Sequence, residues 1–270
     1  MDGGVSLEKI HHNVNKTIHT VDFICELENV SKNYHTMTSE TEAIKEVSIQ
    51  IRKGEILAIV GPSGCGKSTI LSIIAGFEKP SNGIVKIDSK NIGYMFQKDQ
   101  LYEWRSILKN CLLGLEIKKK INKESIEKVR GMLSKYGLEK FENYYPKQLS
   151  GGMRQRAALA RTLAIEPDLL LLDEPFSALD YQTRLSVGND VGEILRKEKI
   201  TTILVTHDIP EAVSISDRVI VLTGRPARIK KEFEINFDID ENERTPINCR
   251  NNNKFGEYFR EIWKELDIVE

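Results

Sequence analysis

Apolar and polar residues follow two different periods in the first third of the chain. Valine and isoleucine alternate with polar neighbours between residues 47 and 51, and an unbroken apolar run follows at residues 56–60. The alternation predicts a half-buried strand, and the unbroken run predicts a fully buried one. A glycine-rich stretch, residues 61–66, leads into residues 67–75, whose apolar positions follow helical spacing. The predicted order is therefore strand, glycine loop and helix.

The rest of the chain alternates between helical and strand-like patterns. Residues from about 104 to 165 are charged and carry apolar positions at helical spacing, most clearly in residues 125–136, which predicts a helical subdomain. Polar turns then separate strands expected at residues 169–172, 202–205 and 218–222 and a helix expected at residues 186–197. Strands that alternate with helices predict an α/β fold with a mostly parallel sheet.

Both ends of the chain differ from the main domain, which we expect to span residues 25–235. Residues 1–24 are polar and keep neither period for long, which predicts a loosely ordered extension. The three histidines of this extension could bind a metal, but their spacing matches no recurring ligand geometry, so a solvated tail is favoured. In residues 236–270, aromatic and aliphatic residues at helical intervals predict an amphipathic helix that packs on the domain, with a partner surface as the alternative.

Composition and charge narrow the class of protein. The 270 residues include 39 Lys and Arg against 40 Asp and Glu, so the overall basic excess of a dedicated nucleic-acid binder is absent, although local basic patches stay possible. The longest stretch without charge has 11 residues, at 56–66, which is far shorter than the ~20 apolar residues of a membrane-spanning helix. The first 25 residues contain no apolar core of a secretory signal, so we expect a cytosolic protein. The four cysteines show no metal-binding or disulfide spacing and are expected to be packing residues.

A phosphate-binding loop is the clearest chemical motif. Residues 61–68 read Gly-Pro-Ser-Gly-Cys-Gly-Lys-Ser, which matches G-x-x-x-x-G-K-[ST] between a buried strand and a helix. Glycines let consecutive backbone N–H groups point at phosphate oxygens, and the helix dipole adds positive potential. Lys67 would contact the β and γ phosphates, Ser68 would help to bind Mg²⁺, and Thr69 would reach the α phosphate. The predicted phosphate site comprises Gly61, Pro62, Ser63, Gly64, Cys65, Gly66, Lys67, Ser68 and Thr69.

Polar side chains also follow two of the predicted strands. Asp173 and Glu174 end the apolar run at 169–172, and His207 follows the run at 202–205. The carboxyl ends of parallel strands present ligands at one edge of a sheet, so these groups should meet the phosphates. Asp173 is expected to orient Mg²⁺, Glu174 to act as general base toward the attacking water, and His207 to contact the γ phosphate.

A second anion-binding motif lies in the helical part. Ser150 is a plausible N-cap, and Gly151 and Gly152 after it would expose backbone N–H groups at the start of a helix. One nucleotide needs only one cradle of this kind. The second must therefore serve another nucleotide or another subunit.

These motifs, in this order and spacing, resemble the ATP-binding cassette (ABC) family over about residues 23–225. Residues 149–156, Leu-Ser-Gly-Gly-Met-Arg-Gln-Arg, are similar to the signature motif of that family. Gln97 resembles its Q-loop glutamine, residues 177–180 resemble its D-loop, and His207 resembles its H-loop histidine. The resemblance implies a P-loop NTPase core with a mostly parallel sheet, an antiparallel β subdomain and an α-helical subdomain that carries the signature motif.

The resemblance also implies how the two cradles are used. Two cassettes would pair head to tail, so that Ser150 and Gly152 of one chain close over the ATP held by Lys67 of the other. Tyr34 would stack on adenine. The implied site comprises Glu174, His207 and Gln97 in catalysis, Ser68, Gln97 and Asp173 around Mg²⁺, and Tyr34, residues 61–69, Ser150, Gly151, Gly152 and Asp180 around ATP.

Residues 101–105, 114–117 and 206–212 are most similar to importers for nitrate, sulfonates, taurine and related small compounds. We therefore expect the ATP-hydrolysing subunit of an importer, acting as a homodimer at the cytoplasmic face of the membrane. Its expected partners are a separate transmembrane permease and, indirectly, a substrate-binding protein, without nucleic acid. The transported compound is not encoded in these motifs.

Two other classes are weaker alternatives. A soluble ABC-type ATPase that acts on DNA or ribosomes should show a long coiled-coil insertion, a tandem cassette or a basic arm, and none is evident in the sequence. A GTPase or small-molecule kinase has no use for the signature motif, and the N-K-x-D tetrad that reads guanine is absent from the chain.

Overall fold

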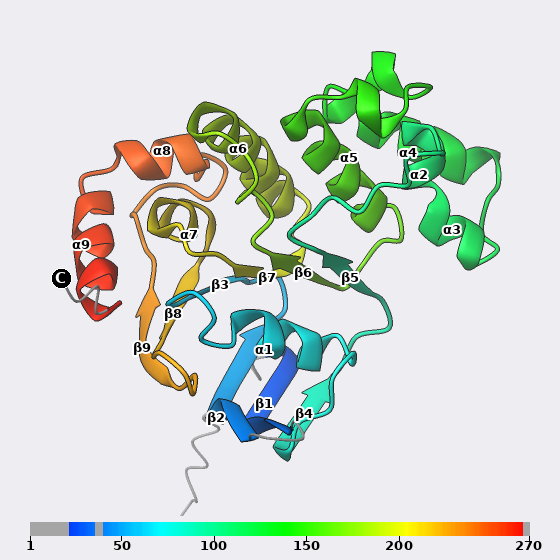
Figure 1. Cartoon of the computed structure of the whole chain (residues 1–270). Coiled ribbons are helices and arrows are strands. Elements are labelled where there is room, and N and C mark those ends of the chain that lie inside the picture. The colour runs from blue at the N-terminus through cyan, green and yellow to red at the C-terminus, as the bar shows by residue number, and fades with distance from the viewer. Residues whose placement is uncertain (1–21, 36–39, 267–270) are drawn as a thin grey trace, which may run out of the picture.

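A computed structural model describes residues 22–35 and 40–266, and its arrangement is shown in Figure 1. A six-stranded sheet runs through the middle of the molecule in the order β5-β6-β7-β3-β8-β9. The first five strands of that order are parallel, and β9 pairs with β8 in the antiparallel sense. The strands are β3 (Ile56–Val60), β5 (Ile92–Met95), β6 (Leu169–Asp173), β7 (Thr201–Val205), β8 (Arg218–Leu222) and β9 (Ile229–Glu234). The predicted α/β class with a mostly parallel sheet is therefore confirmed.

A smaller antiparallel sheet lies below the first one in Figure 1. It has the order β2-β1-β4, formed by β1 (Phe23–His35), β2 (Glu40–Arg52) and β4 (Asn82–Ile87). The period-two alternation predicted the C-terminal half of β2, whose alternate residues are buried. This sheet is the antiparallel β part that the family resemblance implied.

Both faces of the parallel sheet are covered, because successive residues of each strand point to opposite sides. On β6, Leu170 and Leu172 pack with the helices on one side, and Leu169 and Leu171 pack on the other side with helix α1 (Lys67–Ile74). Burial on both faces explains why these strands read as unbroken apolar runs. The four cysteines are buried and free, and each belongs to one of the apolar clusters.

Helices α2 to α5 form a group beside the sheet, at the upper right of Figure 1. The helix expected at residues 125–136 is α4, which begins after Asn122, where Asn122 and Ser125 form a reciprocal capping box. It ends at Lys135, and Gly137 follows shortly after in the left-handed conformation, with a φ of 70°. The group comprises α2 (Ile107–Cys111), α3 (Leu113–Ile117), α4 (Lys123–Lys135) and α5 (Gly151–Leu163), with short 3-10 turns at Glu139–Phe141 and Pro146–Gln148.

The remaining helices cover the other end of the sheet. They are α6 (Tyr181–Lys197), α7 (Ile209–Ile215), α8 (Pro246–Asn251) and α9 (Phe255–Glu265). Helix α6 begins five residues before the expected position, because the Asp180 side chain caps it by accepting a hydrogen bond from the Thr183 N–H. The predicted amphipathic helix is α9, and it packs on the domain: Ile262 is fully buried in a cluster with residues of α7, β8 and β9.

Two sequence expectations concern membrane contact and the N-terminal extension. None of the helices in the described part of the chain combines the length and apolar composition that crossing a bilayer requires. The expected extension at residues 1–24, including His11, His12 and His19, lies outside the described residues up to residue 21, and β1 begins at Phe23.

Candidate nucleotide-binding site

The glycine loop joins the end of β3 to the start of α1, as the sequence predicted. Gly66, which precedes α1, has a φ of 128°, and a Cβ atom there would lie 2.9 Å from the backbone oxygen of Ala43. Gly64 also has a positive φ, of 70°. Both the backbone angle and the close approach of β2 therefore require glycine at position 66.

Lys67 is held inside this loop. Its side chain is buried, and its Nζ atom donates hydrogen bonds to the carbonyl oxygens of Gly61 at 2.8 Å and Pro62 at 3.0 Å. An ammonium group has three N–H donors, so one remains for a ligand. The loop thus presents a fixed positive charge at the centre of the predicted phosphate cradle.

The loop forms one wall of a cavity of about 360 Å³. Tyr34 and two residues of β2 form another wall, and the Tyr34 ring lies 5.0 Å from the Nζ atom of Lys32. The lining residues are Tyr34, Thr41, Ala43, Gly64, Gly66, Lys67, Ser68, Thr69, Glu174 and Arg225. The structure therefore brings the predicted adenine-stacking aromatic, the phosphate loop and the predicted general base to one cavity.

Ser68 and Asp173 form an oxygen pair at the base of the site. The Ser68 hydroxyl donates to Asp173 Oδ1 at 2.8 Å, and the Tyr94 hydroxyl donates to Asp173 Oδ2 at 3.2 Å. Burial raises the pKa of the Asp173 carboxyl, and the hydrogen bonds from Ser68 and Tyr94 oppose that rise. A hydroxyl and a carboxylate in contact are the ligands that Mg²⁺ prefers, so these residues fit the expected metal.

Glu174 follows β6 in a left-handed conformation, with a φ of 46°. Its Oε2 atom lies 3.2 Å from Gln97 Nε2 and 3.3 Å from His207 Nδ1. For a residue with a Cβ this backbone region is strained, and such strain persists where surrounding contacts enforce it. The three predicted catalytic side chains, Glu174, Gln97 and His207, therefore meet at the carboxyl edge of the sheet. Gln97 also contacts the Ser177 hydroxyl at 3.3 Å, and its role as a metal ligand stays a prediction.

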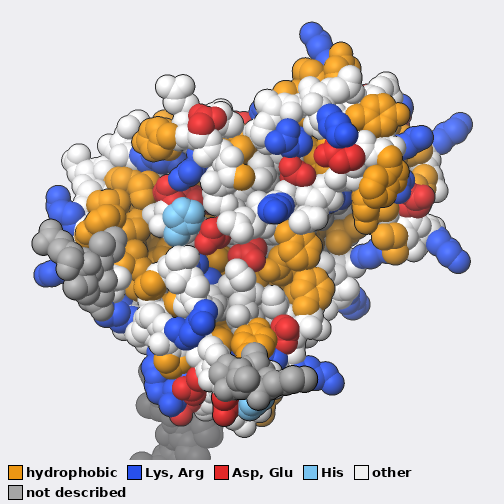
Figure 2. Space-filling view, viewed as in Figure 1, with side chains coloured by type: hydrophobic (Ala, Val, Ile, Leu, Met, Phe, Trp, Pro, Cys, Tyr) orange, Lys and Arg blue, Asp and Glu red, His pale blue; other side chains and the backbone are white. Residues whose placement is uncertain are grey.

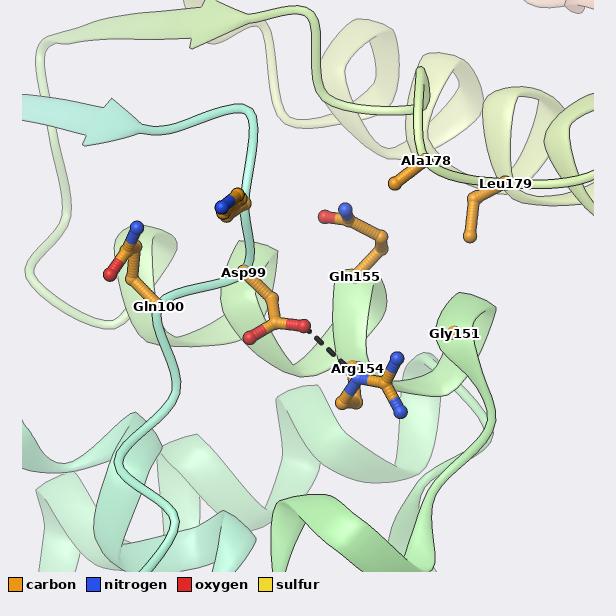
Figure 3. A pocket seen from close by; sticks show the side chains of 8 residues that line it. Asp99, Gln100, Gly151, Arg154, Gln155, Ala178 and Leu179 are labelled. Carbon is orange, nitrogen blue, oxygen red and sulfur yellow. Dashed lines mark hydrogen bonds and ion pairs between the residues drawn. The ribbon is translucent and has the colours of Figure 1, made fainter.

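The signature segment lies at the start of α5 and lines a different cavity, of about 310 Å³ (Figure 3). Ser150 caps α5 as predicted, because its hydroxyl accepts from the Met153 N–H at 3.3 Å. Arg154 joins this segment to the residues after Gln97, since its Nε atom donates to Asp99 Oδ2 at 3.0 Å and its Nη1 atom to the Leu149 carbonyl at 2.9 Å. In a single chain, the two predicted cradles are thus separate pockets with different lining residues.

Gly152 of the predicted second cradle and Asp180 of the D-loop segment have structural roles as well. Gly152 is buried, and a Cβ atom there would lie 2.7 Å from Thr183 Cγ2 and 3.2 Å from Val187 Cγ2, so glycine allows α5 to approach α6 closely. Asp180 caps α6 through its carboxylate. From the sequence, both residues were expected only to contact nucleotide.

Three residues near the site were not assigned from the sequence. Tyr94 holds Asp173, Ser177 contacts Gln97, and Arg225 lines the cavity and donates to the phosphate loop. Arg225 follows the apolar run at 218–222, and its place after a parallel strand is a signal that could have identified it. Tyr94 and Ser177 lie within the segments that resemble the Q-loop and D-loop.

The fold and this cavity define a P-loop nucleotide-binding domain. The sequence profile of the ABC transporter family matches residues 44–177. The chain is 45% identical to an ABC transporter ATP-binding protein of Bacillus subtilis, over 90% of this chain and 96% of that protein. It is also 39% identical to a taurine import ATP-binding protein of Pelagibacter ubique, over 81% and 88% of the two chains. The chain therefore belongs to the ABC transporter family, as one of its ATP-binding proteins.

Solved structures agree with this assignment. A dimeric bacterial ABC transporter cassette has a TM-score of 0.69 and 33% sequence identity, and covers 78% of this chain and 99% of its own. A dimeric post-hydrolysis state of an ATP-binding cassette, bound to ADP and phosphate, has a TM-score of 0.68 at 33% identity over the same shares of the two chains. The predicted fold and the predicted ATP hydrolase activity are thereby confirmed.

Proposed function

We propose that this protein is the energy-coupling ATPase of an importer and works as a head-to-tail homodimer beneath a separate permease. The proposal rests on the separation of the two predicted anion-binding cradles, the phosphate loop and the start of α5. The first cavity contains Lys67, Ser68 and Glu174, and the second lies at the start of α5 beside Gly151. In a head-to-tail pair, Ser150 and Gly152 of one chain would close over the nucleotide bound by Lys67 of the other.

We propose a separate role for each residue in and around the first cavity. Tyr34 offers a face for adenine, Lys67 and the loop N–H groups bind the phosphates, and Glu174 accepts a proton from the attacking water. Ser68 and Asp173, with Gln97, are the proposed holders of Mg²⁺, which when bound neutralises charge on the phosphates. His207 is the proposed donor to the γ phosphate. Asp180 is proposed to contact nucleotide across the dimer interface.

The cargo follows only from relatives. One of them, 39% identical, is an aliphatic sulfonates import ATP-binding protein of Bacillus cereus, and it covers 78% of this chain. We infer a cargo of the sulfonate, taurine or nitrate type, imported through a permease with a substrate-binding protein outside the membrane. The ATPase would then be peripheral on the cytoplasmic face.

Two structural observations favour transport over action on DNA or ribosomes. The longest helix in the described residues is α6, with 17 residues, which is too short for a coiled-coil insertion. On the face shown in Figure 2, basic and acidic side chains are interspersed, and apolar side chains gather between the helical group and the sheet. An extended basic groove for a nucleic-acid backbone is not seen on that face.

The test uses Glu174→Gln, which keeps the shape of the side chain but cannot take a proton. We expect ATP hydrolysis to fall by about 10² to 10⁴ while ATP still binds. ATP that stays bound without being hydrolysed should then hold two chains together by mass action. Static light scattering should therefore show a dimer that depends on ATP. Glu193→Gln, at an exposed position of α6, is the matched control and should hydrolyse ATP normally.

A second variant tests the geometry of the dimer. Adding Ser150→Arg to Glu174→Gln should abolish the dimer while ATP binding at Lys67 continues. The long arginine side chain would replace a small serine at the point where the two chains are proposed to meet, and would keep them apart. If the Glu174→Gln protein stays monomeric when saturated with ATP at the highest soluble concentration, the head-to-tail proposal is wrong.

A further inference from the structure

The loop between β8 and β9 is attached to the nucleotide cavity at several points. The Ala227 N–H donates to the Ala43 carbonyl at 2.9 Å, and the Lys45 N–H donates to the Ala227 carbonyl at 3.0 Å. Within the loop, Thr223 and Arg228 are joined by two hydrogen bonds of 2.9 Å, one to a carbonyl and one to the Thr223 hydroxyl. The loop therefore has a fixed position relative to β2, which forms one wall of the cavity.

Arg225 extends from this loop onto the phosphate loop. Its Nη2 atom lies 2.7 Å from the Gly64 carbonyl oxygen and its Nε atom 3.2 Å from the same oxygen, and both donate. A guanidinium group has five N–H donors in a rigid fork, so two bonds to one carbonyl leave three for other acceptors. Arg225 also lines the cavity with Tyr34 and Lys67, so its side chain borders the space proposed for the nucleotide.

The charge of the cavity indicates what such a donor would bind. Lys67 and Arg225 are its cationic lining residues, and Lys67 already gives two of its three donors to loop carbonyls. ATP carries several negative charges, and a guanidinium binds phosphate oxygens through short, charge-assisted hydrogen bonds. A side chain that is locked to the Gly64 carbonyl loses little further freedom on contacting a ligand, so it is preorganised for this task.

We propose that Arg225 is a nucleotide-binding residue that contributes a second cation to the phosphate chain of ATP while it holds the phosphate loop through Gly64. This inference rests on the proposed nucleotide site. It adds to that site a residue from the β8–β9 loop, outside the glycine loop and outside the segments that resemble the family motifs.

The experiment compares Arg225→Gln with the unchanged protein by isothermal titration calorimetry with ATP and with adenosine. Glutamine keeps an N–H donor for the Gly64 carbonyl but has no charge. We expect ATP affinity to fall by about 5- to 30-fold, since Arg225 is exposed and its charge is partly screened, while adenosine affinity stays the same. The ATP affinity of the variant should also depend less on salt concentration than that of the unchanged protein.

Arg228→Gln is the matched control. Arg228 lies three positions further along the same loop. Its Nη1 atom is 3.4 Å from Glu46 Oε2, and the residue does not line the cavity. Its substitution should leave ATP affinity and salt dependence unchanged. If Arg225→Gln binds ATP as tightly as the unchanged protein does, the proposed phosphate contact is wrong. An equal loss for ATP and adenosine would also overturn it, because it would show a general distortion of the cavity.

Lys67→Ala distinguishes failure of this inference from failure of the proposed function. Loss of ATP binding in Lys67→Ala together with normal binding in Arg225→Gln would reject only the role of Arg225. Undiminished ATP binding in Lys67→Ala would reject the nucleotide site itself. Thermal melting of each variant without nucleotide shows that a measured loss of affinity is not a loss of folded protein.

Discussion

His207 contacts Glu174 directly, with 3.3 Å between the Nδ1 atom of the histidine and the Oε2 atom of the carboxylate. The two residues follow adjacent parallel strands, since β6 and β7 pair in register from Leu169 opposite Thr201 to Asp173 opposite Val205. The parallel register therefore places the proposed general base and the proposed γ-phosphate donor side by side at one sheet edge. Glu174 stays partly exposed on this edge and lines the cavity.

This relationship predicts that His207→Ala affects the rate of hydrolysis more than the binding of ATP. A donor that stabilises charge on the transferred phosphoryl group is worth about 10² to 10³ in kcat, so we expect a loss of that size. The Kd for ATP, measured with a fluorescent analogue, should change by less than about threefold, because Lys67 and the loop still bind the phosphates. His35→Ala, at an exposed residue at the end of β1, is the control. Normal kcat in His207→Ala would remove this residue from the reaction.

The main site residues could be predicted because local sequence and strand topology suffice to place them. The glycine loop lies between a buried strand and a helix, and Asp173, Glu174 and His207 end apolar runs that had to be parallel strands. The place of Arg225 after an apolar run could have been noticed in the sequence, but its contact with the phosphate loop could not have been predicted. Its contact with Gly64 depends on how the β8–β9 loop attaches to β2, and that attachment joins residues distant in the sequence.

The strands of the fold also differ in how far the sequence alone predicts them. Strands β3, β6, β7 and β8 are buried on both faces and appear in the sequence as apolar runs. Strand β1 pairs with β2 through several register shifts, which interrupt any period of two, and β4 is mostly exposed. Neither strand has a clear hydrophobic signal of its own, and each is defined by its pairing partner.

Gly66 is the position where the backbone of the phosphate loop is most constrained. We expect Gly66→Ala to lower stability by roughly 1–3 kcal/mol, because its φ of 128° is strained for alanine and the added Cβ would lie 2.9 Å from the Ala43 oxygen. ATP affinity should fall at least tenfold as the loop shifts. Chemical denaturation and calorimetry measure the two effects.

Gly131→Ala is the control for that prediction. Gly131 lies on the exposed side of α4, and a Cβ atom there would meet no atom within 4 Å. Alanine should therefore stabilise the helix by up to about 1 kcal/mol and leave ATP affinity unchanged. Similar outcomes for the two substitutions would contradict the view that the constraint is specific to the phosphate loop.

Glu211 is a buried acid next to the segment that carries His207. It lies on α7, its Oε2 atom accepts from the Thr206 hydroxyl at 2.7 Å, and its backbone N–H donates to Asp208 Oδ1 at 2.9 Å. Burial raises the pKa of the Glu211 carboxyl from 4.5 to about 8; the hydrogen bond from Thr206 opposes this rise, Asp208 adds to it, and the charges of Arg184 and Arg250 oppose it. Helices α6, α7 and α8 therefore surround a carboxyl that is mostly neutral at pH 7.

This shift predicts how the stability of the protein depends on pH. In the unfolded chain the Glu211 carboxyl loses its proton near pH 4.5, whereas in the folded protein it keeps the proton up to about pH 8. The unfolded state thus binds fewer protons across this window, and the contribution of Glu211 to stability falls as the pH rises through it. Glu211→Gln keeps the shape and does not titrate. Its melting temperature minus that of the unchanged protein should increase from pH 5 to about pH 8 and then level off, while Glu193→Gln, on the exposed face of α6, should show a constant difference. A pH-independent difference for Glu211→Gln would show that the buried carboxyl titrates near its ordinary value.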